Sequence, residues 1–220
     1  MPTVLDASLT EPGRDCPLCP RLVAFRHAQR AIHSGWHNAP VPTFGGQARV
    51  LIVGLAPGLQ GANRTGRPFT GDWAGDLLYE TLDSFGLSKG TYAERPDDGL
   101  MLIETAITNA VRCVPPANKP TGPEITTCRP FLAATIARQE SLAAIVALGR
   151  VAHESVLRAL GARLSSLPFG HGREHAVRDA DGRSLTVFDS YHCSRYNTNT
   201  GVLTPDMFRR VFARVKADLC

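Results

Sequence analysis

Short apolar runs alternate with segments of helical spacing along this chain. Four runs, rich in aliphatic and β-branched residues, predict buried strands at Ala48–Gly54, Met101–Thr108, Leu142–Gly149 and Ser184–Phe188. Five segments predict helices: one begins just after Cys19, one begins at Pro123, and three span Ala74–Gly86, Val151–Leu160 and Pro205–Leu219. Buried strands alternating with helices predict an α/β fold, a three-layer α/β/α sandwich around a mainly parallel four-stranded sheet.

The loops that follow these strands are where such a fold places its binding site. The carboxyl ends of neighbouring parallel strands meet at one edge of the sheet, and ligands bind in the loops there. The loops to consider are therefore Gly54–Asp72, Asn109–Pro123 and Tyr191–Gly201. The first is rich in glycine but lacks the lysine of a P-loop, so only its backbone amides are candidates for binding phosphate.

Composition narrows the class of protein. The chain has 220 residues, of which 43% are hydrophobic and 20% charged, and its glycines and prolines fall between the periodic segments. We therefore expect residues 1–220 to form a single domain, with residues 1–15 as a flexible N-terminal extension. Without a long apolar stretch or a leader-like N-terminus, we expect a cytoplasmic protein with no membrane partner. A net charge of +4 permits a polyanionic partner without requiring one.

Six cysteines indicate a metal site, because disulfides are rare in a reducing cytosol. Four of them form a C-x2-C and a C-x14-C pair: Cys16 with Cys19, and Cys113 with Cys128. Four thiolates can hold a zinc ion or a 4Fe-4S cluster, and buried thiols without a metal are a third interpretation. The long second spacing favours the cluster over zinc. Cys193 and Cys220 stand apart from this set.

Five segments, taken together and in this order, resemble the uracil-DNA glycosylase superfamily. They are CPLCPRLV, GLAPG…NRTGRPFTGD, AVRCVPPANKPT, ALGR and SYHCSRYNTNTG. The resemblance covers nearly the whole chain and is strongest to the iron-sulfur branches, above all to family 5, also called type B. It implies that Cys16, Cys19, Cys113 and Cys128 are the ligands of a structural 4Fe-4S cluster.

The same resemblance implies the catalytic residues. Most of the superfamily places Asp, Asn or Glu directly after the first strand, where this chain has Leu55 and Ala56, and that departure marks family 5. Asp72 matches the residue that takes over catalysis, although a helix N-cap before Trp73 would also suit it. His192 matches the histidine that stabilises the departing base, and we expect Asn118 to orient water or the base.

The substrate-binding residues follow from the need to flip a base out of the duplex into a pocket. Phe69 resembles the aromatic residue on which the flipped base stacks, although core packing would equally suit a phenylalanine. Asn109 lies at the end of the second predicted strand, where related families read the uracil edge with an amide. Gly54 and Ala56, after the first strand, complete the expected binding set.

The resemblance implies a monofunctional glycosylase that removes uracil, and more weakly hypoxanthine, from double-stranded DNA. We expect a monomer, associated with the nucleoid through its DNA. One group of residues flanks the motif loops and is expected to contact DNA, with the last two as candidate wedges in the minor groove: Arg64, Arg67, Lys119, Arg195 and Tyr196.

Two alternatives stay open. The first is a strictly uracil-specific, family 4-type glycosylase, which normally carries Glu where Leu55 stands. The second is a non-enzymatic nucleic-acid-binding domain stabilised by zinc on four cysteines, in which Asp72 and His192 are structural.

Overall fold

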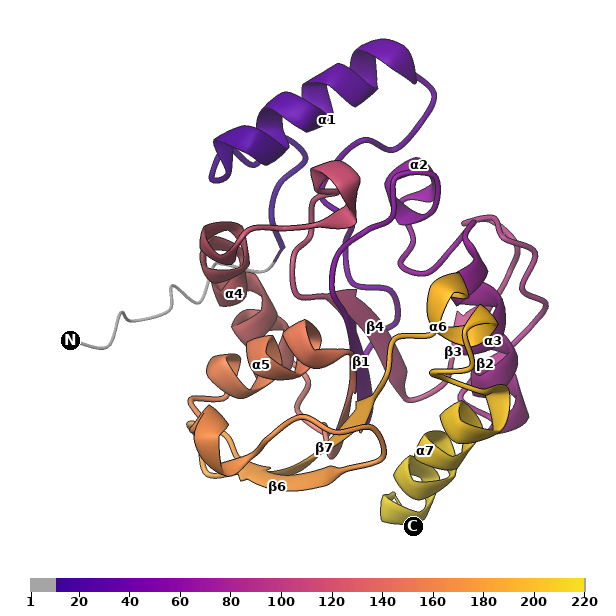
Figure 1. The fold of residues 1–220 in the computed structure, drawn as a ribbon, viewed down its shortest axis with the longest axis vertical. Coiled ribbons are helices and arrows are strands. Elements are labelled where there is room, and N and C mark those ends of the chain that lie inside the picture. Colours follow the sequence, from indigo (N-terminus) through magenta and orange to yellow (C-terminus); the bar gives the residue numbers. More distant parts are fainter. Residues whose placement is uncertain (1–10, 220) are drawn as a thin grey trace.

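The computed structural model describes residues 11–219 and has a central sheet with helices on both faces (Figure 1). Its strands lie in the order β4-β1-β5-β7-β6. The four predicted apolar runs supply the parallel strands β1 (Val50–Gly54), β4 (Thr105–Asn109), β5 (Ala144–Leu148) and β7 (Ser184–Ser190). Every residue of β1, β4 and β5 is buried, as expected of a sheet covered on both faces.

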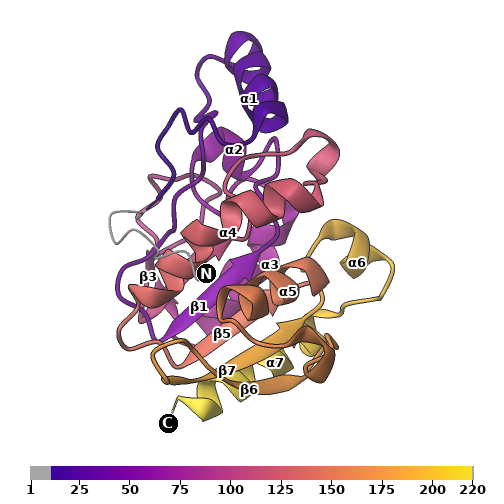
Figure 2. The same ribbon diagram turned by 90° about the vertical axis from the view of Figure 1, so that its left-hand side faces the viewer.

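Side chains of successive strand residues point to opposite faces, and each face packs on its own pair of helices. Val50 and Ile52 pack with α3 (Trp73–Ser84) and α7 (Pro205–Asp218). Leu51 and Val53 pack with α4 (Gly122–Ala137) and α5 (Arg150–Ala159). Figure 2 shows α4 and α5 in front of the strands and α7 behind them. The three-layer arrangement is therefore confirmed.

The prediction of four strands is wrong, because a fifth strand, β6 (Glu174–Arg178), pairs antiparallel with β7. Only His175 and Val177 of β6 are buried, so this strand lacks the apolar run that marks the others. Alternation over so few residues, with a histidine at one buried position, is a weak signal in a sequence.

The second predicted strand is also divided. Its first part, β3 (Met101–Leu102), pairs with β2 (Ser88–Lys89) in a separate two-stranded sheet, whereas β4 begins at Thr105. Between them Glu104 has a φ of 46°, a left-handed conformation that interrupts an extended chain. On its outer side β4 is covered by Phe44, which exchanges two backbone hydrogen bonds with Ile107.

The remaining elements are helices and turns outside the sheet. Helix α1 (Pro20–Ile32) stands at one end of the molecule (Figure 1). Two loops that the sequence left irregular contain short helices, α2 (Ala62–Thr65) and α6 (Arg195–Asn199), and 3-10 turns span Pro116–Asn118 and Leu164–Ser166. None of the helices in residues 11–219 is long and apolar enough to cross a membrane.

The segment expected as an N-terminal extension is only partly described. Glu11 forms an ion pair with Arg112, and Asp15 forms one with Arg30. Residues 1–10 lie outside the described residues.

Candidate active site

A pocket with a cavity volume of about 380 Å³ opens where β1, β4 and β7 end. This is the edge of the sheet at which the three candidate loops were expected to meet. Seven of the predicted residues line it: Ala56, Phe69, Asp72, Asn109, Asn118, His192 and Arg195. Trp73 and Ser194 also line it and were not predicted. The signal for Trp73 was its position directly after Asp72, at the start of a helix.

Phe69 and Asn109 form one wall of the pocket, and Gly54, which is not itself in the lining, packs against both. Gly54 pairs with Asn109 in the parallel register of β1 and β4. A Cβ on Gly54 would lie 2.7 Å from Cζ of Phe69 and would also collide with Oδ1 of Asn109, so only glycine fits between them. Phe69 itself has a φ of 53°, and Tyr92 donates a hydrogen bond to its carbonyl oxygen at 3.2 Å. This left-handed backbone conformation, held by the hydrogen bond from Tyr92, places the Phe69 ring at the pocket.

His192 lies against that ring. The His192 and Phe69 ring centroids are 5.8 Å apart, with the planes inclined by 27°. Burial lowers the pKa of His192 to about 4, so the imidazole is neutral at neutral pH. Asn197 donates to the backbone carbonyl of His192 at 2.8 Å, and the preceding amide, of Tyr191, donates to His171 at 3.1 Å. The backbone on both sides of the histidine is thus held in place.

Asp72 occupies the N-cap position of α3 but makes no capping hydrogen bond through its side chain. Its carboxyl group lies where a Cβ on Gly61 would be, and Oδ2 would be 3.1 Å from a Cβ on Gly58. Oδ1 is buried and has no hydrogen-bond partner among the described residues. Burial raises the pKa of Asp72, while the amides of Gly75 and Ala74 favour the ionised form. An acceptor atom is therefore left free inside the pocket.

Asn118 reaches the pocket from the loop between β4 and α4. Ala117 and Asn118 have φ values of 53° and 55°, so two consecutive residues are left-handed in the 3-10 turn that presents this amide. The loop is fixed on its far side by a capping box, in which Thr121 and Glu124 bond each other's backbone amides. Such strain is commonly stored at functional sites.

The predicted DNA contacts divide into exposed and buried residues. Arg64, Lys119 and Arg195 are exposed, and Tyr196 is 75% exposed. Arg67 is not available to DNA, because it is buried and forms two hydrogen bonds, at 2.7 and 2.6 Å, with the carboxylate of Asp98. The ion pair corrects the expectation that Arg67 contacts DNA. Its two residues are 31 positions apart, so the local sequence did not indicate it.

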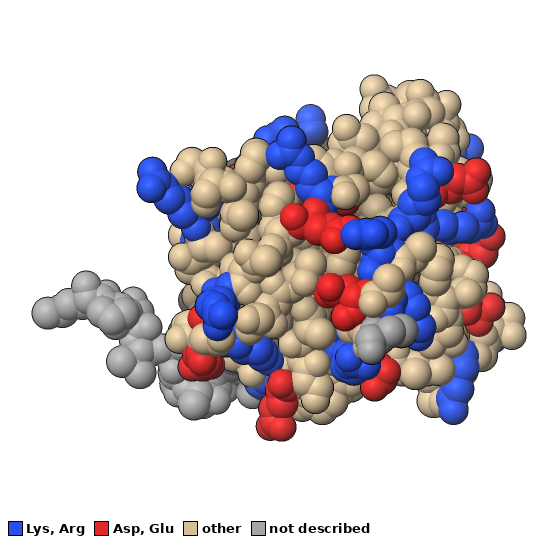
Figure 3. Space-filling view, turned by 90° about the horizontal axis from the view of Figure 1, so that it is seen from below, with Lys and Arg blue, Asp and Glu red and all other residues tan. Residues whose placement is uncertain are grey.

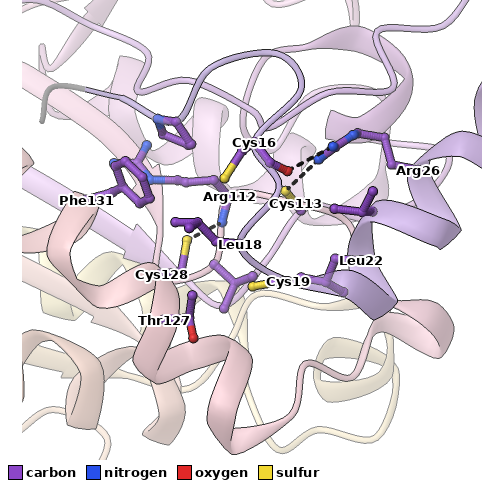
Figure 4. A pocket seen from close by; sticks show the side chains of 13 residues that line it. Cys16, Leu18, Cys19, Leu22, Arg26, Arg112, Cys113, Thr127, Cys128 and Phe131 are labelled. Carbon is purple, nitrogen blue, oxygen red and sulfur yellow. Dashed lines mark hydrogen bonds between the residues drawn. The ribbon is translucent and has the colours of Figure 1, made fainter.

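All four clustered cysteines line a second cavity, between α1, α4 and the loop after β4. Figure 4 shows their sulfur atoms facing this shared space. All four thiols are free. Burial raises the pKa of Cys113 to about 12 and that of Cys128 to about 11. Ala56 packs against the same cluster of side chains and also lines the pocket, so the cavity and the pocket are neighbours.

The spacing of the cysteines bears on which metal fits. In the described residues, one group of three or more ligand atoms lies within 4.8 Å of one another, and it contains no cysteine: His153, His175 and Asp189. No three of the described thiols therefore lie within 4.8 Å of one another, whereas the sulfur ligands of a single tetrahedral zinc are about 3.8 Å apart for a Zn–S bond of about 2.3 Å.

The histidine and aspartate group is a hydrogen-bonded network. Nδ1 of His153 lies 2.7 Å from Oδ1 of Asp189, and Nε2 of His175 lies 3.0 Å from Oδ2. Nε2 of His153 lies 2.9 Å from the carbonyl oxygen of Leu167 and must therefore carry a proton. A lone pair on Nδ1 would face a carboxylate, so this geometry favours the protonated imidazole, and the hydrogen bond and charge of Asp189 raise the pKa of His153.

Comparison with known proteins places the chain in a family. The model of the "Uracil DNA glycosylase superfamily" matches residues 42–216. A type-5 uracil-DNA glycosylase of Thermus thermophilus is 45% identical, over 91% of this chain and 92% of its own length. Its counterpart in Pyrobaculum aerophilum is 41% identical over 93% and 89%. A type-4 uracil-DNA glycosylase of Sulfurisphaera tokodaii is 30% identical over 75% and 69%. Its fold, its pocket and these relatives together show that the chain belongs to the uracil-DNA glycosylase superfamily, on the type-5 side.

Proposed function

We propose that this protein is a monofunctional DNA glycosylase that hydrolyses the N-glycosidic bond of uracil, and of hypoxanthine, in double-stranded DNA. One observation carries the proposal. A single pocket brings together a carboxyl oxygen without a partner, a neutral imidazole, an aromatic ring and two amide side chains. The type-5 relatives, named for uracil-DNA glycosylase activity, support the same assignment.

Recognition of the base falls to the wall formed by Phe69 and Asn109. A flipped base would stack on the Phe69 ring, which Gly54 allows to approach β1. Asn109 is 97% buried and ends β4, and its amide offers a donor and an acceptor to the base edge. Neither contact requires a side chain from Leu55 or Ala56, which are apolar.

Cleavage needs a donor for the base and a negative group near the sugar. Charge builds on the departing base as the bond to C1′ breaks, and the neutral His192 can donate an N–H bond to its carbonyl oxygen. The free Oδ1 of Asp72 accepts a proton from the attacking water or stabilises the positive sugar. Asn118, at the pocket rim, orients that water.

Substrate breadth follows from the apolar entrance. Leu55 and Ala56 line the pocket where a polar residue would select one base edge, so the pocket rejects few planar bases. A cavity volume of about 380 Å³ leaves room for a bicyclic base. The apolar residues at this position favour the broader substrate range over a strictly uracil-specific enzyme.

DNA is held locally around the pocket. Arg64, Lys119 and Arg195 are exposed near it, and Tyr196 on α6 is the more exposed of the two candidate wedges. On the face seen from below in Figure 3, Lys and Arg side chains are interspersed with Asp and Glu, so that face is not uniformly basic. Contacts confined to the surroundings of one pocket fit a monomer that associates with the nucleoid through its DNA.

The four cysteines are proposed to hold a 4Fe-4S cluster with a structural role. Arg26 is 99% buried, donates to Sγ of Cys113 at 3.6 Å, and forms no ion pair with any described carboxylate. Arg112 donates its backbone amide to Sγ of Cys128 at 3.3 Å. A buried cation without a carboxylate fits anionic sulfur ligands, and the wide spacing fits a cluster better than one zinc. Bound there, the cluster would fasten α1 to the loop that carries Asn118.

The test of activity uses duplexes with one uracil or one hypoxanthine, followed by alkali to cleave abasic sites. The wild type should release both bases, and borohydride should trap no covalent intermediate. Asp72→Asn should lower the single-turnover rate by about a hundredfold or more. Asp76→Asn, on the exposed side of the same helix, is the matched control and should keep the rate. An intact uracil strand with stoichiometric wild-type enzyme would contradict the proposal.

The test of the cluster is the metal content of the purified protein. We expect a brown protein that contains iron, and Cys113→Ser should lose both colour and iron. Cys193→Ala should keep them, because Cys193 lies in the core beside α3, donating to Ala74. Colourless wild-type protein with stoichiometric zinc would favour the zinc-stabilised binding domain instead.

A further inference from the structure

The indole of Trp73 connects α3 to α6 at the mouth of the pocket. Trp73 is the first residue of α3, directly after Asp72, and is 49% exposed. Its Nε1–H donates to Oγ1 of Thr198 at 3.2 Å. The guanidinium carbon of Arg195 lies 5.5 Å from the centroid of its ring. Thr198 and Arg195 are three residues apart on α6, so one side chain contacts the same side of that helix twice.

Helix α6 depends on such contacts for its position. It has five residues, which is too short to be a stable helix alone. Ser194 caps its start by accepting from the amide of Asn197. Two side-chain contacts join α6 to α3, the helix that begins after Asp72. They are the hydrogen bond from Trp73 to Thr198 and the contact of Arg195 with the Trp73 ring.

The guanidinium of Arg195 is available to bind an anion. It lines the pocket, is exposed, and forms no ion pair with a carboxylate of residues 11–219. Stacking on an indole uses the face of the guanidinium and leaves the N–H groups in its plane free. Those N–H groups match the oxygen atoms of a phosphate.

We propose that Trp73 is a positioning residue, which holds Arg195 at the pocket mouth so that the guanidinium binds a backbone phosphate beside the flipped nucleotide. The inference rests on the DNA-binding part of the proposed function. In this proposal Trp73 acts through Arg195 and not on the reacting bond. Its loss should therefore weaken DNA binding and leave the chemical step unchanged.

The first experiment measures how the affinity for DNA depends on salt. The probe is a duplex with a tetrahydrofuran abasic-site analogue, which is not cleaved. Arg195→Ala should reduce the slope of log affinity against log salt by about 0.9, the value for one phosphate. Trp73→Ala should reduce it equally and weaken binding roughly fivefold, and the double variant should lose no more. Trp73→Phe, which keeps the ring face, should keep the slope.

Single-turnover excision of uracil at saturating enzyme separates positioning from catalysis. Trp73→Ala and Trp73→Phe should match the wild-type rate at saturation, and Trp73→Ala should need a higher enzyme concentration to reach it. A wild-type salt slope in Trp73→Ala, a slope loss that adds to that of Arg195→Ala, or a reduced saturating rate in Trp73→Ala would each overturn the inference.

Fluorescence supplies a readout that a structural role alone would not move. The chain has two tryptophans, and Trp36, stacked on His33 with centroids 3.8 Å apart, is not in the pocket lining. A Trp36→Phe variant therefore reports Trp73 alone. Its emission should change when the tetrahydrofuran duplex binds, and adding Arg195→Ala should reduce that change. Unchanged emission on binding would overturn the inference.

The two proposals fail separately. Wild-type protein that binds the duplex with a slope dependent on Trp73, yet releases no uracil, would contradict the proposed function and support the inference. Wild-type protein that releases uracil, with a slope independent of Trp73, would contradict the inference alone.

Discussion

Gly54 and Phe69 approach so closely that a methyl group on Gly54 would lie 2.7 Å from Cζ of the phenylalanine. Gly54→Ala must therefore move the ring or the strand. We expect roughly a hundredfold loss of single-turnover excision, because displacement of a binding group by about 1 Å costs about that much. Affinity for a tetrahydrofuran duplex should change little.

The matched control for this variant is Gly46→Ala. A Cβ at Gly46 would meet nothing within 4 Å, and its φ is not positive. This variant should retain full excision. Equal rates for the two alanine variants would show that the ring is not needed at its observed position.

The pH dependence of excision should lack the inflection of an ordinary histidine. Burial lowers the pKa of His192 to about 4, so its neutral donor form persists well below neutral pH. Burial raises the pKa of Asp72, so the acid limb should follow loss of its carboxylate as pH falls. Single-turnover rates should be level between about pH 8 and pH 6.5, the ordinary imidazole range. An inflection there that disappears in His192→Gln would contradict this prediction.

The buried pair of His153 and Asp189 should make stability depend on pH. Burial alone lowers the pKa of His153, but the hydrogen bond and charge of Asp189 outweigh it and raise the pKa. The stabilisation is therefore complete below the ordinary value of about 6.5 and is lost as pH rises through the folded value. Asp189→Asn should lower the free energy of unfolding by about 3 kcal/mol at low pH and by less at high pH.

Urea unfolding at several pH values measures this difference, with Asp181→Asn as the control. Asp181 is exposed in the turn between β6 and β7, and its replacement should change neither stability nor its pH dependence. A loss in Asp189→Asn that is the same at all pH values would show that His153 is not charged in the folded protein.

Arg67 and Arg64 should give opposite results although they lie three residues apart. Arg67→Ala leaves Asp98 buried without its partner, so we expect a loss of about 3 kcal/mol and a lower Tm. The salt dependence of DNA binding should stay unchanged. Arg64→Ala should keep the Tm and reduce the salt slope by about 0.9. The reverse pattern would restore Arg67 as a DNA contact.

The sequence predicts whatever depends on local pattern. The apolar runs locate all four parallel strands, and strand ends converge at one edge, so Asn109 and His192 were expected in the same site. Pairings between distant segments are not predictable in this way. Asp98 neutralises Arg67 from 31 residues away, and Thr198 binds Trp73 across 125 residues. The sequence does not predict strand β6, because its buried side carries a hydrogen-bonded histidine, His175, and no apolar run.

The two edge strands of the sheet affect how this protein behaves at high concentration. A bare strand edge is a template on which another chain can add, and so a route to aggregation. Here Phe44 already occupies the backbone groups of Ile107 on β4. The opposite edge, β6, is five residues long and begins and ends on the charged Glu174 and Arg178. Both edges of the sheet are therefore poor templates for a strand from another copy, so the folded protein can be concentrated without sheet-to-sheet pairing.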